Sequence, residues 1–359
     1  MTQTAQRAAA GWAAGYGTLA LVWAVTGRGY PYGPAAPHND ASVLRAVPAD
    51  VGAPVFAAVL LTAAVALIAL GPGGPRRPLE RILTGYLWVV AAALLLVVPD
   101  VRLLTVAGYL PVIIGGLPFG WPPIDYGDVF TWTLANEALA VAGGVLIARA
   151  VLRRQRHSSG ACVDCGRTGD PSGWTAPAAA ARWGRAAAWT AAVIPALYAA
   201  VRLAWAAGYP LGITPEFLAE MRRTGLVWAG AGLGVFALAG AVLTLGLTQR
   251  WGERFPRWMP WLGGRTVPIR LATVPAAVVA VFVWSASVSL YTGDGSEALL
   301  RGTDLLSRLP MLLWPLWSVA LGAAAYGYHL RRRPPCEQCG NATGATGKGL
   351  VHRHRPSAY

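Results

Sequence analysis

Eight apolar stretches, each about 20 residues long, constrain the fold of this chain more than any other feature. A helix needs about 20 predominantly apolar residues to cross the hydrocarbon core of a bilayer, where it satisfies its own backbone hydrogen bonds. Hydrophobic residues make up 55% of the chain and charged residues 13%, whereas soluble domains carry about a quarter charged residues. The sequence therefore predicts an all-α membrane protein with eight transmembrane helices, at residues 8–27, 51–70, 82–98, 129–147, 186–207, 225–248, 271–290 and 309–330.

The positions of the arginines predict the topology of these helices. Of the 30 Lys and Arg residues, 22 fall at the start of the chain or in the segments 71–81, 149–185, 249–270 and 331–359. Cytoplasmic loops carry such an excess of positive charge, so we expect both termini in the cytosol and the protein in the plasma membrane. Because these arginines flank apolar runs, the bilayer is the expected partner and nucleic acid is not.

One segment, residues 101–128, fits neither a span nor a loop. It is too apolar for a solvated loop, and too short and too rich in Pro and Gly for a full span. We expect an interfacial or re-entrant segment on the outer face.

Two markers suggest that the chain is a tandem duplication. The sequence GRGYPYG at 27–33 aligns with AAGYPLG at 206–212, and the arginine pair 153–154 aligns with 332–333 at the same offset of 179 residues. Each arginine pair is followed by a CxxCG motif. Four spans return the chain to the face where it began, so the halves are expected to be parallel repeats. The predicted organisation is a first four-helix repeat at 1–157, a linker with the first CxxCG knuckle at 158–181, a second repeat at 182–333, and a tail with the second knuckle at 334–359.

The four cysteines, Cys162, Cys165, Cys336 and Cys339, form these two CxxCG motifs. Two thiolates in one turn can reach the same ion, and the glycines that follow, Gly166 and Gly340, permit a tight turn. If the two knuckles meet on the cytosolic side, they form a zinc-ribbon-like site of four thiolates. The sequence thus predicts a closed, structural zinc site.

Other roles for the cysteines stay open. Nearby arginines would favour a reactive dithiol, although no thioredoxin-like βαβ pattern surrounds either pair. Separate metal sites and the absence of any function are further alternatives, and disulfides are not expected in a reducing cytosol. His157, His352 and His354 are interpreted as solvated side chains before metal ligands.

Two charged residues, Glu137 and Arg202, lie well inside predicted spans. Ionisable residues within a membrane are expensive and commonly functional. Both lie at a similar depth below the outer boundary, so we predict a buried Glu137–Arg202 pair with Asn136 as an added hydrogen-bond partner. In the alternative interpretation Arg202 reaches the headgroups and Glu137 is protonated or faces a wet crevice.

Carboxylates near the outer face show no spacing typical of a metal site. They are Asp100, Asp125, Asp128, Asp294, Glu297 and Asp304, and we interpret them as residues of solvated loops.

Three functions are compatible with these features. The first is a non-catalytic scaffold or sensor whose zinc node recruits a cytosolic partner or reports redox state. The second is a transporter-like bundle for a small solute or lipid, centred on Glu137 and Arg202. The third is an intramembrane enzyme acting on an isoprenoid or lipid, with Glu137 or the outer carboxylates as acid and base. The duplicated cysteine motif favours the first, and the small-molecule ligand is not specified by the sequence.

Overall fold

The protein is described by a computed structural model, which places residues 2–34, 36, 42–71, 77–116, 118, 126–167, 173–292, 305–334 and 336. These residues form helices and one isolated β-bridge, Arg254 with Thr266, and no strand. The elements are α1 (Thr2–Thr26), η1 (Val43–Ala46), α2 (Ala49–Ala69), α3 (Arg77–Leu96), α4 (Val101–Gly116), α5 (Tyr126–Val129), α6 (Trp132–Ser158), α7 (Pro177–Ala207), α8 (Pro215–Arg223), α9 (Leu226–Gly246), η3 (Arg250–Gly252), α10 (Ile269–Thr292), α12 (Leu305–Leu312) and α13 (Trp314–Arg332).

The all-helical membrane architecture is as predicted. Among the described residues, seven helices are long and apolar enough to cross a membrane: α1, α2, α3, α6, α7, α9 and α10. The eighth predicted span is a bent pair, α12 and α13, with an angle of 43° between them. Pro315 lies in the first turn of α13, and proline supplies no backbone N–H to continue the hydrogen bonds of a preceding helix.

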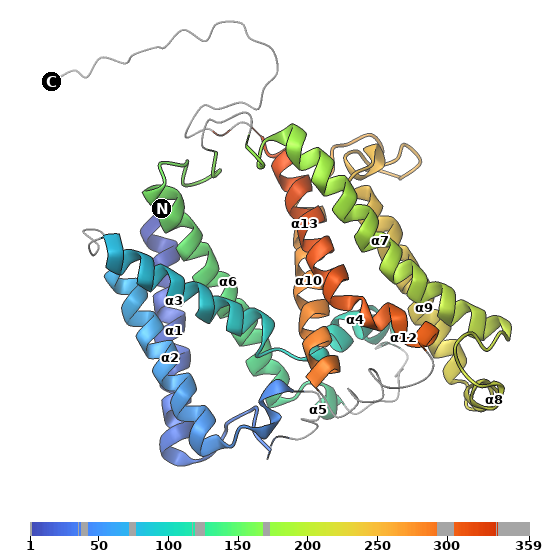
Figure 1. Cartoon of the computed structure of the whole chain (residues 1–359), viewed down its shortest axis with the longest axis horizontal. Coiled ribbons are helices and arrows are strands. Elements are labelled where there is room, and N and C mark those ends of the chain that lie inside the picture. The colour runs from blue at the N-terminus through green and yellow to red at the C-terminus, as the bar shows by residue number, and fades with distance from the viewer. Residues whose placement is uncertain are drawn as a thin grey trace, which may run out of the picture.

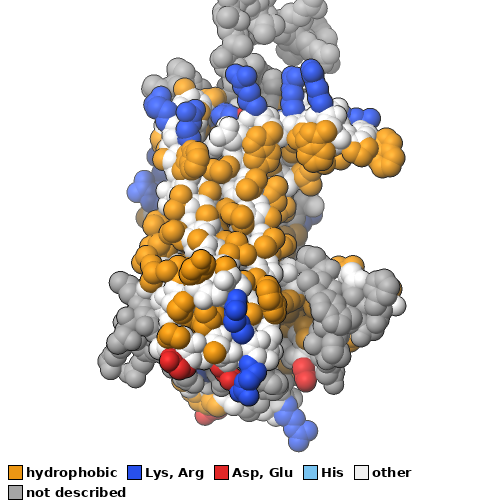
Figure 2. Space-filling view, turned by 90° about the vertical axis from the view of Figure 1, so that its right-hand side faces the viewer, with side chains coloured by type: hydrophobic (Ala, Val, Ile, Leu, Met, Phe, Trp, Pro, Cys, Tyr) orange, Lys and Arg blue, Asp and Glu red, His pale blue; other side chains and the backbone are white. Residues whose placement is uncertain are grey.

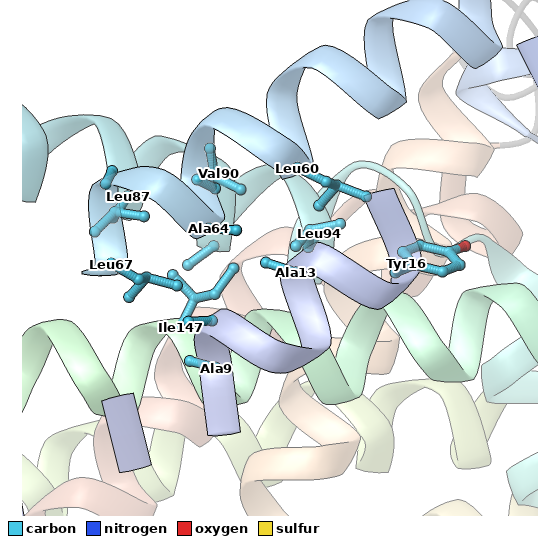
Figure 3. Packing of buried hydrophobic residues seen from close by; sticks show 14 of the residues in the cluster. Ala9, Ala13, Tyr16, Leu60, Ala64, Leu67, Leu87, Val90, Leu94 and Ile147 are labelled. Carbon is cyan, nitrogen blue, oxygen red and sulfur yellow. The ribbon is translucent and has the colours of Figure 1, made fainter. Parts of the chain in front are cut away.

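The spanning helices pack as two groups along the chain (Figure 1). In the first group α1 contacts α2 and α6, and α3 contacts α6; in the second, α7 contacts α9 and α13, and α10 contacts α13. The first core is rich in alanine and includes Ala9, Ala13, Leu60 and Ile147, which interdigitate at close range (Figure 3). Small side chains suit this packing, because lipid supplies no hydrophobic force between helices and close backbone contact must replace it.

The described helix ends that flank the five arginine-bearing segments lie at one end of the molecule. The start of α1, the C-terminal ends of α2, α6, α9 and α13, and the N-terminal ends of α3, α7 and α10 all lie there (Figure 1). Figure 2 shows a face on which hydrophobic side chains form a broad band, with Lys and Arg gathered above it. Val65, Ile68 and Leu243 are each about two-thirds exposed on the outside of their helices, as expected for side chains that face lipid.

The segment that fitted neither span nor loop contains α4, a helix of 16 residues and therefore shorter than a span. This helix packs against both α10 and α6 at the end opposite the cysteines (Figure 1). Two hydrogen bonds also join the groups at this end: Ser285 Oγ to Leu95 O at 3.4 Å and Arg45 Nη1 to Thr292 O at 2.8 Å. The two groups of helices are therefore in contact at this end through α10, which packs against α4 and α3.

Candidate metal centre

The first cysteine knuckle follows directly from the end of α6. The chain turns so that Gly166 N donates to Cys162 O at 2.7 Å, and Cys162 N donates to the carbonyl of Arg167 at 3.0 Å. Gly166 has φ +69°, a left-handed conformation that a side chain disfavours. This compact turn holds Cys162 and Cys165 on one side of the loop.

The second knuckle begins with Cys336, four residues after α13 ends, and the structure brings this cysteine to the first knuckle. Cys162 Sγ lies 3.8 Å from Cys336 Sγ, although the two residues are 174 positions apart. The sulfurs of Cys162, Cys165 and Cys336 all lie within 4.8 Å of one another. A tetrahedral zinc ion with Zn–S bonds of about 2.3 Å separates its sulfurs by about 3.8 Å. Three cysteines are thus close enough to hold one metal ion, and their sulfurs are thiols rather than members of disulfides.

Two arginines form hydrogen bonds between the first knuckle and the residues around the start of the second. Arg167 Nη2 donates to the carbonyls of Arg333 and Pro334, at 3.1 and 3.0 Å. In return, Arg333 Nη1 donates to Cys165 O at 2.8 Å. A third arginine, Arg156, donates to the carbonyls of Val163 and Asp164 within the first knuckle. The backbone around the sulfurs is therefore held by hydrogen bonds from charged donors, which are stronger than neutral ones.

The same arginines make the site electropositive. Burial lowers the pKa of Arg333, and the neighbouring cations Arg167 and Arg156 lower it further, whereas the Cys165 thiolate raises it. An electropositive setting favours thiolate over thiol. It also suits a zinc ion with four thiolates, which carries a net charge of about −2.

The fourth predicted ligand and the histidines near the knuckles are not part of the described cluster. Cys339 lies outside the described residues, as do Gly340, His352 and His354. His157 is exposed at the end of α6 and does not belong to the group of sulfurs.

The predicted Glu137–Arg202 pair is not formed. The cation beside Glu137 is Arg102, whose Nε lies 3.5 Å from Glu137 Oε1. The physical reason is that α4 brings Arg102 against α6 within the first half of the chain, whereas Arg202 lies on α7 in the second. Comparable depth in a membrane does not determine which helices are neighbours.

Arg202 instead lies among aromatic rings. Its guanidinium carbon is 5.0 Å from the ring centroid of Tyr198 and 4.7 Å from that of Trp205. The helix α9 comes close to it at Gly230 and Gly234, where an added Cβ would lie 3.6 and 3.1 Å from the nearest Arg202 atoms. Cation–π contacts with tryptophan and tyrosine stabilise such a cation without a carboxylate.

Asn136 is fully buried, as is Glu137, and it connects α6 to α1. Its Oδ1 accepts a hydrogen bond of 3.0 Å from Tyr16, and its Nδ2 donates to Trp132 O at 2.7 Å. Tyr16 also shares a hydrogen bond of 3.1 Å with Tyr32. Asn136 therefore hydrogen-bonds to α1 and to its own helix, and neither bond is to Glu137.

The interpretation of Asp100 as a solvated loop residue is wrong. Asp100 is 1% exposed, and Arg102 Nε donates to both of its carboxylate oxygens, at 3.0 and 2.9 Å. Asp128 is exposed, and Asp125, Asp294, Glu297 and Asp304 lie outside the described residues. The sequence did contain a signal for this ion pair, since a carboxylate and a guanidinium two residues apart open an apolar segment.

Comparison with protein-family models, curated proteins and solved structures finds no match to this chain.

Proposed function

We propose that this protein is a non-catalytic scaffold or sensor of the plasma membrane, built around a zinc ion at its cytosolic end. Cys162, Cys165, Cys336 and Cys339 bind the ion, and both termini lie in the cytosol. A zinc ion with four protein ligands has no open position for a substrate, so its role is structural. The resulting zinc-ribbon-like node is the surface that recruits a cytosolic partner protein.

The observation that carries this proposal is the approach of sulfurs from distant parts of the chain. The distance of 3.8 Å between Cys162 and Cys336 equals the separation of about 3.8 Å expected across a tetrahedral zinc site. The reciprocal bonds of Arg167 and Arg333 hold the two knuckles together through their backbones. Thiols in a metal-binding arrangement are expected in a reducing compartment, which supports the cytosolic orientation.

We further propose that the chain is a tandem repeat of two parallel four-helix units, at 1–157 and 182–333, joined by the linker 158–181 and followed by the tail 334–359. The contacts support it, because three helix pairs correspond in order. The pairs α1–α2, α1–α6 and α3–α6 of the first unit match α7–α9, α7–α13 and α10–α13 of the second. In this arrangement each unit is followed by one of the two knuckles that form the node.

The node then links metal binding to the contacts that hold the two helix groups together. It joins the end of α6 to the end of α13, while α4 and α10 join the opposite end (Figure 1). Removing zinc would release one of two connections between the helix groups. A change of this kind, caused by metal loss or thiol oxidation, is the signal that a bound partner would detect.

The test is elemental analysis of the purified protein with single cysteine variants. We expect one zinc per wild-type chain, and loss of that zinc in Cys162→Ser and in Cys336→Ser alike, because each removes a ligand of one shared ion. His157→Ala, close to the first knuckle but outside the cluster, is the control and should retain zinc. Hydrogen exchange should rise on chelation at both the end of α6 and the end of α13.

Several results would refute the proposal. They are a wild-type protein without bound metal, iron in place of zinc, or retention of a full zinc equivalent by either cysteine variant. Faster exchange at only one knuckle after chelation would contradict the shared site.

A further inference from the structure

A second cluster of charges lies at the end of the first helix group opposite the cysteines. Asp100 precedes α4, Arg102 is in its first turn, and Glu137 lies in the second turn of α6. Both carboxylates lie within 3.5 Å of a single nitrogen, Arg102 Nε. Asp100 is bound by that nitrogen and by Nη2, whereas the only contact of Glu137 with this arginine is the longer one.

Glu137 is buried without the hydrogen bonds that a carboxylate requires. Its side chain is 0% exposed, and neither oxygen accepts a hydrogen bond from the described residues. The neutral polar groups nearby form hydrogen bonds with other residues: Asn136 with Tyr16 and Trp132, and Tyr16 with Tyr32. A buried carboxylate normally accepts several hydrogen bonds, so its neutralisation must come from another source.

The charges of the cluster do not balance when both carboxylates are ionised. Asp100 and Arg102 neutralise each other through a bidentate ion pair, which leaves the charge of Glu137 without compensation. An uncompensated buried charge costs several kcal/mol in a protein interior. Two carboxylates that share one site cannot both ionise at low cost, so one of them retains a proton.

We propose that Asp100, Arg102 and Glu137 form a buried proton-binding site, in which one exchangeable proton is held on Glu137 while Asp100 remains ion-paired with Arg102. Among the described residues, the titratable groups that interact with Glu137 are Tyr16 from α1, Tyr32 from the segment after α1, Asp100 from the segment after α3, and Arg102 from α4. Burial raises the pKa of Tyr32 well above its usual value, so this hydroxyl stays neutral and supplies no charge to the site.

A proton fits this site better than a metal cation does. Both oxygens of Asp100 already accept hydrogen bonds from Arg102. The guanidinium 3.5 Å from Glu137 would repel a second cation, and within the described part of the chain Glu137 belongs to no group of three metal-ligating side chains. A proton needs no coordination sphere and converts Glu137 from an unsatisfied acceptor into a possible donor.

Loss of this proton would act on the contact between the two helix groups. Once ionised, Glu137 competes with Asp100 for Arg102, which belongs to the first turn of α4. That helix packs against α10 of the second group as well as against α6. The occupancy of the proton site is therefore coupled to the position of α4 between the groups.

Infrared difference spectroscopy of the purified protein in lipid nanodiscs tests the site. We expect the carbonyl stretch of a protonated carboxyl group at neutral pH, shifted in D2O because the proton exchanges, and lost as a single step when the pH is raised. Glu137→Gln should abolish this band. The matched control is Glu253→Gln, since Glu253 is ion-paired with Arg331 at the other end of the molecule, and this variant should keep the band.

The amide of Glu137→Gln is neutral and similar in shape, so the variant should fold, and its elution in size-exclusion chromatography verifies this. Absence of the band in the wild type, or its persistence in folded Glu137→Gln, would overturn the proposal. Removal of the band by sodium or calcium ions at constant pH would also overturn it, in favour of a cation site. If Glu137→Gln does not fold, Asp100→Asn provides the second measurement: the band must change in frequency, and an unchanged band refutes a proton held beside Asp100.

Discussion

Arg167, at the end of the first knuckle, and Arg333, just before the second, each donate a hydrogen bond to the backbone on the other side of the cysteine cluster. Arg167 reaches the carbonyl of Arg333 at 3.1 Å, and Arg333 reaches the carbonyl of Cys165 at 2.8 Å. Neither arginine is a metal ligand, so the pair positions the sulfurs through the main chain. This reciprocal arrangement orients the ligands from outside the coordination sphere, where substitutions commonly weaken metal binding by about 10- to 100-fold.

The first prediction concerns this pair. Arg167→Ala should increase the rate of zinc loss to a chelator by roughly 10-fold or more, because the second knuckle loses its hydrogen bonds to the first. The measurement is the absorbance of a zinc-sensitive dye after rapid mixing. Zinc should still bind at one equivalent, since all four sulfurs remain.

The control for this experiment is Arg182→Ala. Arg182 is exposed in α7 at the same end of the molecule, so this variant removes an equal charge without removing a bond between the knuckles. Equal rates for the two variants would mean that net charge alone governs zinc retention.

The second prediction concerns packing between α1 and α6. A Cβ on Gly143 would overlap the ring of Trp12, approaching it more closely than side chains can. Gly143→Ala should therefore lower the free energy of unfolding by roughly 1–3 kcal/mol, the usual cost of overpacking. Thermal unfolding in detergent, followed by circular dichroism, measures the loss.

Gly85 provides the comparison because it is also helical, but a Cβ added there would meet no atom within 4 Å. Gly85→Ala should leave stability unchanged or raise it by up to about 1 kcal/mol, through better helix propensity. A similar loss for both variants would contradict the role of the Trp12 contact.

Much of the fold follows from hydropathy, but the ends of the helices do not. The span predicted at 51–70 corresponds closely to Ala49–Ala69, and 271–290 to Ile269–Thr292. The helix that contains the span predicted at 129–147 is longer than that span, because α6 continues to Ser158 past several arginines. Hydropathy detects the edge of the bilayer, whereas helical hydrogen bonds continue into water beyond it.

The two candidate sites differ in how far the sequence could predict them. The approach of Cys162 to Cys336 follows from topology, since motifs at the same end of two helix groups can meet. The contact of Arg102 with Glu137 does not, because Arg102 belongs to a helix too short to be recognised as a span. The close pair of Gly184 and Gly327 between α7 and α13 is likewise invisible in a chain with 43 glycines.

The third prediction concerns alkaline pH. Burial raises the pKa of Tyr30 from its ordinary value of 10.0 to about 12. The unfolded chain therefore loses this proton at a lower pH than the folded protein does. The resulting stability is fully present below pH 10 and is lost as the pH rises toward 12.

Tyr30→Phe should reduce this alkaline loss of stability, measured by thermal unfolding at a series of pH values. The Tyr30 hydroxyl is buried without a hydrogen-bond partner among the described residues, so its removal should also be neutral or stabilising at pH 7. A variant whose stability falls with pH as steeply as that of the wild type would exclude Tyr30 as the source.

The fourth prediction compares Arg102 with Arg202 as ion-pair partners of the buried carboxylates. Arg102→Met should destabilise the protein by roughly 3–5 kcal/mol, because Asp100 is then left as an uncompensated buried charge. Adding Asp100→Asn should recover part of that loss, which gives a large coupling energy in a double-mutant cycle.

The same cycle between Arg202→Met and Glu137→Gln should be additive within about 0.5 kcal/mol, since Arg202 lies over Tyr198 and Trp205. Chemical unfolding in mixed micelles supplies all the free energies. Strong coupling between Glu137 and Arg202 would show that the two helix groups meet in the membrane through these charges, and would contradict the placement of α4.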